Sequence, residues 1–227
     1  QPYECYEQFH VRKYGFHGTS HRFVSMKYGE VTGKSLEGLN IVSCHLGNGS
    51  SITAIKDGKS VDTSMGFTPL DGIIMGTRSG SVDPSAVEFV QNKLGFTPAQ
   101  MSDYLNKKSG FLGLSGQFSD NRDITSAAQQ GDKRSQLVTD MLTYEIKKYI
   151  GSYTAAMNGL DVVIFTGGIG ENAPEVRKGV CENMEYLGIK LDSSVNDGLK
   201  GKLTKISAPD SKVEVWVIPT NEELLIA

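Results

Sequence analysis

Long apolar runs and paired cysteines are both missing from this sequence. No apolar run approaches the roughly 20 residues that a membrane-spanning helix needs, and residues 1–4 are polar, unlike the start of a secretory signal. The three cysteines, Cys5, Cys44 and Cys181, are an odd number and include no C-x-x-C pair. They predict neither a disulfide framework nor a thiolate metal site, and they suit a reducing compartment. We therefore expect a cytoplasmic protein with no membrane partner.

A large excess of charge of one sign is also missing. The 227 residues include 23 Lys and Arg against 26 Asp and Glu, for a net charge of −3 at pH 7, and the basic residues form no cluster. We expect no nucleic-acid partner, so any phosphate binding has to come from a local arrangement of groups. With no internal repeat, low-complexity tract or linker, residues 1–227 are expected to form one domain. The chain lacks an initiator Met and ends in the apolar run 223–227 without a helix-ending signal, so we expect a piece of a longer protein.

Three short β-rich segments follow one another early in the chain. Residues 40–46 lead into a glycine-containing turn, residues 51–55 alternate weakly, and residues 60–63 return after Asp57-Gly58, which is a strong hairpin signal. These segments predict three consecutive antiparallel strands.

Helices and strands alternate in the rest of the chain. Asp83-Pro84 and Thr97-Pro98 each combine an N-cap residue with Pro at the first helical position. The patterns predict helices at 84–94, 98–108, 133–158 and 174–184 and buried strands at 161–165 and 213–218. A meander followed by alternating helices and strands indicates a layered α/β domain.

Four turns, each containing or following glycines, end a strand or open a helix, where backbone N–H groups can bind phosphate. They are residues 45–51, 75–80, 119–123 and 166–172. Each also has a plainer interpretation: a hairpin turn at 45–51, a tight βα connection at 166–172, a solvated Arg78 in 75–80, and a surface loop with an Asp N-cap at 119–123.

Two other motifs in the sequence resemble nucleotide-binding fingerprints. Residues 168–173 fit G-x-G-x-x-A, and Asp192 follows near the place of a ribose-binding acid. A dinucleotide fold is disfavoured because a meander precedes this turn and too few residues follow Asp192 for the βα units it needs. Residues 29–35 resemble a P-loop but have three residues between the glycines where four are required, so an exposed turn is expected there.

Histidines concentrate in glycine-containing turns. The chain has four histidines, and His17, His21 and His45 all lie in such turns. An imidazolium can donate to a transferring phosphoryl group and partly neutralise it. The spacing of His17 and His21 also suits a zinc pair on a helix, but Gly18 and Ser20 disfavour a helix there and no third ligand is nearby in the sequence.

Five segments together resemble the acetate and propionate kinase family. Residues 14–21 (YGFHGTSH) resemble one of its signatures, 45–51 its first phosphate loop, and 62–80 its catalytic-arginine segment. Residues 165–172 resemble its adenosine-binding loop, and 219–223 its magnesium segment. The matches occur in order over nearly the whole chain. The resemblance implies an actin/Hsp70/sugar-kinase-like (ribonuclease H-like) α/β fold, with this chain as the nucleotide-binding C-terminal domain of a two-domain kinase.

The resemblance also implies roles for individual residues. His17 and Arg78 would stabilise the transition state, Phe16 and Pro69 would enclose the acetate methyl group, and Glu222 would bind Mg²⁺. The phosphates of ATP or ADP would contact His45, Leu46, Gly47, Asn48 and Gly49. The rest of the nucleotide would contact Asp120, Asn121, Arg122, Gly168, Ile169, Gly170, Glu171 and Asn172, although many family members carry Met or a similar residue at the position of Asn121.

The activity implied is reversible transfer of the γ-phosphoryl group of ATP to acetate or a similar short carboxylate, by a protein that is a homodimer when complete. The catalytic Asp, second Arg and Asn that the family's first domain supplies are not found in this sequence, so the chain alone is expected to be inactive. Propionate as acceptor, pyrophosphate as phosphate partner, a non-catalytic nucleotide-binding module and a structural interaction domain remain open alternatives.

Overall fold

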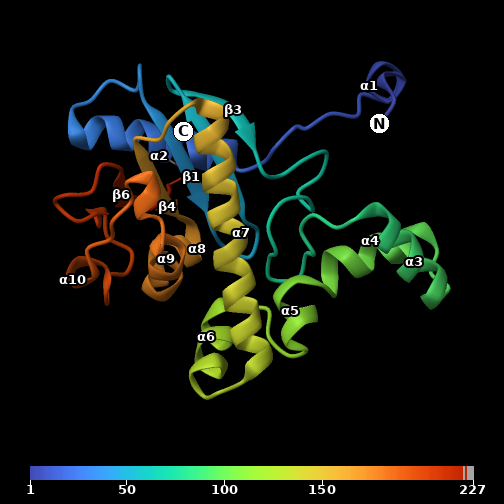
Figure 1. Ribbon diagram of the computed structural model, residues 1–227. Helices are drawn as coiled ribbons and strands as arrows, with labels where there is room; N and C mark the ends of the chain where they lie inside the picture. Colours follow the sequence, from blue (N-terminus) through green and yellow to red (C-terminus); the bar gives the residue numbers. More distant parts are fainter. Residues whose placement is uncertain (222, 224–227) are drawn as a thin grey trace.

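The computed structural model describes residues 1–221 and 223 (Figure 1). Its helices are α1 (Tyr3–Phe9), α2 (Gly18–Thr32), α3 (Pro84–Leu94), α4 (Pro98–Lys107), α5 (Gly110–Ser115), α6 (Asn121–Gln129), α7 (Lys133–Met157), α8 (Gly167–Asn172), α9 (Pro174–Cys181) and α10 (Ser193–Asn196), with a 3-10 turn η1 (Glu185–Leu187). Its strands are β1 (Asn40–His45), β2 (Ser51–Lys56), β3 (Lys59–Thr63), β4 (Val162–Thr166), β5 (Thr204–Lys205) and β6 (Glu214–Val217).

The strands of the described residues form one mixed sheet in the order β3-β2-β1-β4-β6-β5. The first three are antiparallel neighbours, which confirms the predicted meander, whereas β4 pairs in parallel with both β1 and β6. In the β1–β4 register, His45 lies opposite Thr166. The carboxyl ends of the two central strands therefore meet at the same edge of the sheet, together with the glycine-rich turns that follow them.

Helices cover both faces of the sheet (Figure 1). The long helix α7 packs on one face, where Val42 and Cys44 of β1 join its residues Leu142 and Ile146 in the larger core. On the opposite face α2 packs against β1 and β4, in a smaller core that contains Ile41. Successive β1 side chains thus alternate between the two helices, as the pleat of a strand requires.

The helix α2 corrects the expectation that Gly18 and Ser20 prevent a helix at residues 17–21. His17 is its N-cap with a left-handed φ of 58°, and the helix begins at Gly18. The buried face of α2 includes His21 and Val24, packed on the sheet. Tertiary packing of this face stabilises a helix whose first turn has weak intrinsic propensity.

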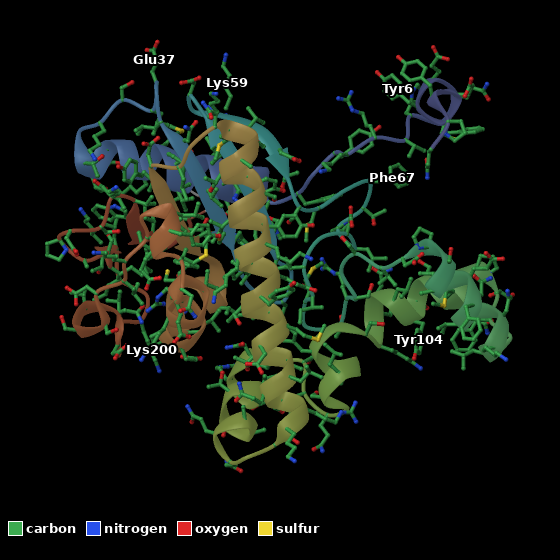
Figure 2. All side chains as sticks on the ribbon, viewed as in Figure 1. Tyr6, Glu37, Lys59, Phe67, Tyr104 and Lys200 are labelled. Atoms are coloured by element: carbon green, nitrogen blue, oxygen red, sulfur yellow. The ribbon has the colours of Figure 1, made fainter. Side chains whose placement is uncertain are left out.

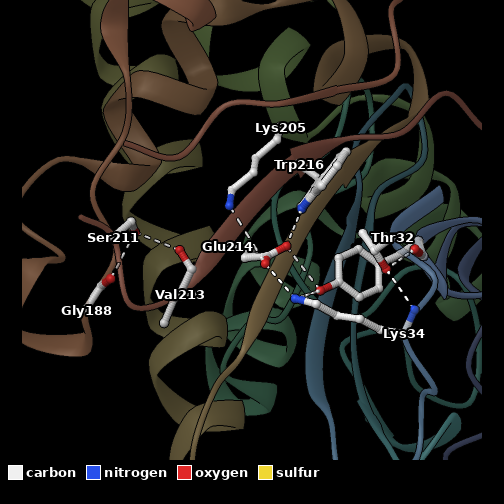
Figure 3. Close-up of polar contacts among 9 residues, drawn as sticks. Thr32, Lys34, Gly188, Lys205, Ser211, Val213, Glu214 and Trp216 are labelled. Atoms are coloured by element: carbon white, nitrogen blue, oxygen red, sulfur yellow. Dashed lines mark hydrogen bonds and ion pairs between the residues drawn. The ribbon is translucent and has the colours of Figure 1, made fainter. Parts of the chain in front are cut away.

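Glu214 on β6 ties the end of α2 to the sheet (Figure 3). Its carboxylate accepts hydrogen bonds from Tyr28 Oη (3.1 Å), Lys34 Nζ (2.7 Å) and Trp216 Nε1 (2.8 Å). Burial alone would raise the pKa of Glu214, but the hydrogen bonds from Lys34 and Trp216 lower it by more, so the pKa of this carboxyl group lies below its ordinary value.

The segment 29–35, expected to be an exposed turn, is the last turn of α2 followed by a turn, because α2 ends at Thr32.

The predicted caps and boundaries of the later helices agree with the structure to within a few residues. Asp83 accepts from Ser85 N (2.8 Å) at the start of α3, and Thr97 forms a complete capping box with Gln100 in α4. The largest deviation is α9, which ends at Cys181 where residues up to 184 were expected.

Two parts of the chain extend away from the sheet, α1 at one end and the pair α3–α4 (Figures 1 and 2). Tyr6 and Phe67 are exposed, and neither α1 nor α3 has a buried residue. Among the described residues, no helix is both long and apolar enough to cross a membrane.

Candidate functional site

The glycine-rich turns after β1 and β4 are joined by backbone hydrogen bonds. Leu46 N donates to the carbonyl of Thr166 (2.9 Å), and Ile169 N donates to the carbonyl of Leu46 (2.8 Å). Gly167 has a φ of +76°, and a Cβ atom there would lie 2.7 Å from the Leu46 carbonyl oxygen. Glycine is required at this position because of both the left-handed backbone and the close approach of the two turns.

A groove of about 820 Å³ opens beside these turns and beneath the start of α6. Its lining includes Lys200, which is labelled in Figure 2. The predicted nucleotide-binding residues that line it are Gly47, Asn48, Asp120, Asn121, Arg122, Gly168, Ile169 and Asn172. Segments more than a hundred residues apart in sequence thus meet in one concave surface.

The start of α6 presents an ion pair at the rim of this groove. Asp120 caps the helix by accepting from Arg122 N (2.8 Å), and its carboxylate also accepts from Arg122 Nε (3.0 Å) and Nη2 (2.7 Å). The hydrogen bonds from Arg122 lower the pKa of Asp120. The N-cap interpretation of this turn is confirmed, and the same turn borders the groove.

Five of the predicted nucleotide contacts do not line this groove: His45, Leu46 and Gly49 of the first turn, and Gly170 and Glu171 of α8. The carboxylate of Glu171 accepts from the backbone N–H groups of Gly167 (2.9 Å) and Thr220 (3.1 Å), which directs it into the protein. Glu171 instead joins α8 to the backbone at Thr220.

Arg177 supports α8 from behind and was not singled out in the sequence. This fully buried side chain donates to the carbonyls of Gly170 (2.9 Å) and Glu171 (3.0 Å) at the end of α8. It also donates to Asn196 Oδ1 (2.8 Å) and to the carbonyls of Asn196 (3.4 Å) and Leu199 (2.9 Å). No local pattern distinguishes this arginine from an exposed one on the helix, so the sequence carried no signal for it.

His17 and Arg78 meet at Gly49, next to the groove residue Asn48. A Cβ atom on Gly49 would lie 3.3 Å from Arg78 Nη1 and 3.5 Å from His17 Nε2. The imidazole of His17 stacks on that of His45, with ring centroids 4.1 Å apart. The two residues predicted to stabilise the transition state are therefore brought together, although 61 positions separate them in the sequence.

The three histidines form a hydrogen-bonded group with serines, in which His21 and His45 are buried and His17 is half-buried. His17 Nδ1 is 2.9 Å from Ser51 Oγ, and His21 Nε2 is 2.7 Å from the same oxygen. His45 Nδ1 is 2.8 Å from Ser20 Oγ. His21 and the two serines lie within the quoted motifs, but their roles depend on contacts that the sequence does not reveal.

The pKa values of all three histidines are lowered, which favours neutral rings over the imidazolium considered from the sequence. Burial, assisted by the charge of Arg78, lowers the pKa of His17. Burial and the neighbouring His17 lower the pKa of His45 to about 4, and burial lowers that of His21 to about 3. His17 can act as a neutral donor, and Arg78 supplies the positive charge.

The loop that carries Arg78 is fixed on both sides. Gly76 N donates to the carbonyl of Asn48 (3.3 Å), and Arg78 Nη1 donates to the carbonyl of Pro69 (3.0 Å). Pro69 therefore lies beside Arg78. Phe16 lines a separate cavity of about 350 Å³ whose lining, among the described residues, does not include Pro69.

Comparison with known proteins agrees with this geometry. The model of the acetokinase family matches residues 1–227. The chain belongs to the acetokinase family. It is 57% identical to the acetate kinase of Dictyoglomus turgidum over 226 residues, which cover 100% of this chain and 56% of that protein. It is also 56% identical to the acetate kinase of Thermotoga maritima, covering 57% of that protein.

Solved structures of this family share the fold. The crystal structure of Porphyromonas gingivalis acetate kinase matches with a TM-score of 0.98 and 50% identity, over 100% of this chain and 57% of that one. A propionate kinase from Francisella tularensis matches with a TM-score of 0.93 and 42% identity, over the same shares. The predicted layered α/β fold is confirmed, and these kinases share it. The chain spans about 56% of the length of the curated relatives it matches.

The predicted metal ligand of this acetokinase-family chain, Glu222, lies outside the described residues. Within residues 1–221 and 223, no group of three or more His, Cys, Asp and Glu side chains is arranged to hold a metal ion. The His17–His21–His45 group is instead hydrogen-bonded to serines.

Proposed function

We propose that this chain is the nucleotide-binding, C-terminal domain of a kinase that transfers the γ-phosphoryl group of ATP reversibly to acetate or a similar short carboxylate. The observation that carries the proposal is the continuity of the site. A glycine-lined groove of nucleotide size reaches Asn48, and the next residue, Gly49, faces both His17 and Arg78. Membership of the acetokinase family supports the same assignment.

In this proposal the groove positions the nucleotide and Gly49 marks the reaction centre. Adenosine lies between α8 and the Asp120–Arg122 turn, and the phosphates extend along the backbone N–H groups of Gly47–Gly49. A carboxylate oxygen attacks the γ-phosphorus, the bond to the β–γ bridging oxygen breaks, and ADP leaves with that electron pair. The acceptor is already an anion, so the step needs no general base.

Charge neutralisation is the main contribution of the protein to such a step. Arg78 stabilises the equatorial phosphoryl oxygens by its charge, and neutral His17 donates a hydrogen bond from Nε2. A preorganised donor of this kind is typically worth roughly 3–4 kcal/mol in the transition state. Mg²⁺ bound to a nucleotide is usually held by one or two carboxylates together with the phosphates, and we propose that Glu222 supplies one of them.

We further propose that the remaining charged groups come from the part of the protein that this chain does not span, and that the complete protein is a homodimer. The isolated chain is then expected to bind MgADP weakly without turnover. Calorimetry and a hydroxamate assay of the purified chain test this, and robust acetyl phosphate formation by the chain alone would contradict it.

The assignment of Arg78 is tested in the complete protein. Arg78→Ala is expected to lower kcat by about 10²–10³-fold, the cost of one preorganised donor or more, with little change in ATP affinity. Arg134→Ala is the matched control, because Arg134 is an exposed arginine outside the groove lining. Near-normal turnover of the Arg78 variant would overturn the assignment.

Propionate is the second candidate acceptor, supported by the match to a propionate kinase. One methylene changes binding in an apolar pocket by only about 1–3 kcal/mol. The ratio of kcat/KM for acetate and propionate therefore decides between them, and replacing ATP by pyrophosphate tests the phosphate partner in the same assay.

A further inference from the structure

A series of three hydrogen bonds runs through buried side chains to the ring of His17. Ser43 Oγ on β1 lies 2.9 Å from His21 Nδ1 on α2. His21 Nε2 lies 2.7 Å from Ser51 Oγ on β2, which lies 2.9 Å from His17 Nδ1. Ser43 and Ser51 are fully buried, and His21 is 4% exposed.

Because each ring is neutral, two proton arrangements use the Ser51 hydroxyl proton within this series. A third, in which both rings donate to Ser51 Oγ, leaves that buried hydroxyl proton without an acceptor in the series. In the first, Ser43 donates to His21 Nδ1, His21 Nε2–H donates to Ser51, and Ser51 donates to His17 Nδ1. In the second, every donor and acceptor is reversed. The first arrangement leaves His17 with its proton on Nε2, and the second leaves it with its proton on Nδ1.

The two arrangements differ in what happens to the hydroxyl proton of Ser43. In the first it is donated to His21 Nδ1. In the second it has no acceptor among the described residues, inside a fully buried environment. An unsatisfied buried donor is costly, so the second arrangement is disfavoured. In the first arrangement, the one ring N–H that does not donate within the series is on His17 Nε2. That atom faces Gly49 and the Arg78 guanidinium.

We propose that His21 and Ser51 are positioning residues that hold His17 as the Nε2–H tautomer, with that N–H directed at the phosphoryl group. This inference rests on the proposed function only for the identity of the group that accepts the hydrogen bond. The low pKa values of His17 and His21 agree with it, because both rings have to remain neutral for the series to keep its direction. Stacking on His45 also holds the plane of the His17 ring.

The tautomer can be observed directly, without an activity measurement. The chain contains four histidines, so a histidine-selective ¹⁵N label gives few imidazole signals, and single substitutions assign them. At pH 7 we expect His17 and His21 each to show a protonated Nε2 and an unprotonated Nδ1. A proton on Nδ1 of His17, or on both its nitrogens, would overturn the inference even if the protein is an active kinase.

The functional consequence is tested by Ser51→Ala in the complete protein. Loss of the hydroxyl that fixes the ring is expected to lower kcat about 10–100-fold, the usual cost of removing such an outer partner, while KM for ATP stays within about twofold. The ¹⁵N spectrum of the variant should show a mixture of His17 tautomers. Ser25→Ala is the matched control, because Ser25 is a buried serine one turn beyond His21 on α2, and among the described residues its hydroxyl bonds to the Arg22 carbonyl instead of to a histidine.

The outcomes separate the two proposals. An unchanged kcat and an unchanged tautomer in Ser51→Ala would refute the positioning role. Absence of phosphoryl transfer by the unaltered complete protein would refute the proposed function, while the tautomer of His17 would still be measured independently.

Discussion

Replacing Arg177 by Met should reveal how strongly the turn at α8, the proposed nucleotide-binding turn, depends on a buried cation. Met retains much of the length of the side chain but has no donor, so five hydrogen bonds to α8, Asn196 and Leu199 are lost. Burial lowers the pKa of Arg177 to about 10, so the side chain remains charged at neutral pH.

The expected loss of stability follows from what the substitution leaves behind. Hydrogen bonds to a charged group contribute about 1.5–3 kcal/mol each, but the desolvation cost of the buried charge offsets much of their sum. The substitution leaves the acceptors of Gly170, Glu171, Asn196 and Leu199 without this donor, and an unsatisfied buried acceptor costs about 1–3 kcal/mol, so a total of about 3–5 kcal/mol is expected. We expect that loss in the free energy of unfolding, which for a chain of this size corresponds to a fall in Tm of about 10 °C.

Urea unfolding followed by circular dichroism measures this loss, and calorimetry with MgADP measures the accompanying loss of nucleotide affinity. Arg134→Met is the control, since Arg134 also donates to two carbonyls, those of Leu114 (2.6 Å) and Gly113 (3.1 Å), but is exposed. Water can replace those bonds, so a change within about 0.5 kcal/mol is expected. If Arg177→Met unfolds within about 1 kcal/mol of the unaltered protein, with the same m-value, the buried network does not stabilise α8.

Three further predictions follow from individual contacts. Gly110→Ala should lower the free energy of unfolding by roughly 3 kcal/mol or more, because φ at this position is +58° and the new methyl group would collide with the Met75 carbonyl. Thermal unfolding measures this loss of stability, and an unchanged Tm would contradict the prediction. Glu214→Gln should lower the free energy of unfolding by about 1 kcal/mol at pH 7. Because the pKa of Glu214 is depressed in the folded protein, this difference in stability should vanish as the pH falls below the ordinary value of 4.5 and through the folded pKa. Urea unfolding at several pH values tests this, and a stability difference that persists at low pH would exclude the ionic contribution of Lys34. Gly167→Ala should weaken MgADP binding at least tenfold, because a Cβ atom would lie 2.7 Å from the backbone at the end of β1; calorimetry measures the affinity, and unchanged binding would show that the turn geometry does not matter.

Local chemistry explains why much of the fold could be predicted. The caps at Asp83 and Thr97 are formed by residues two or three positions away, so they are visible in the sequence. The meander and the buried strand β4 follow from apolar patterns and hairpin signals of the same short range. The glycine-rich turns were identified for the same reason, because glycine marks positions where the backbone needs a left-handed φ or close contact.

Long-range packing explains what could not be predicted. The helix α2 begins at a glycine because its buried face packs against β1 and β4, which the propensity of residues 17–21 does not reflect. The direction of the Glu171 carboxylate depends on the backbone of Thr220, 49 positions away. An interaction at such a sequence separation has no local signature.

The sequence by itself determined the α/β class and the family resemblance, and it singled out His17 and Arg78, since each of these is written in short motifs. Only the tertiary structure decided the state of those residues. Burial lowers the pKa of His17 and so favours a neutral ring, although its sequence context suggested an imidazolium. Ser51 of β2 bonds to both His17 and His21, and Arg177 of α9 supports the turn at α8. Charge state and orientation depend on which groups surround a side chain in space, and the folded chain alone brings those groups together.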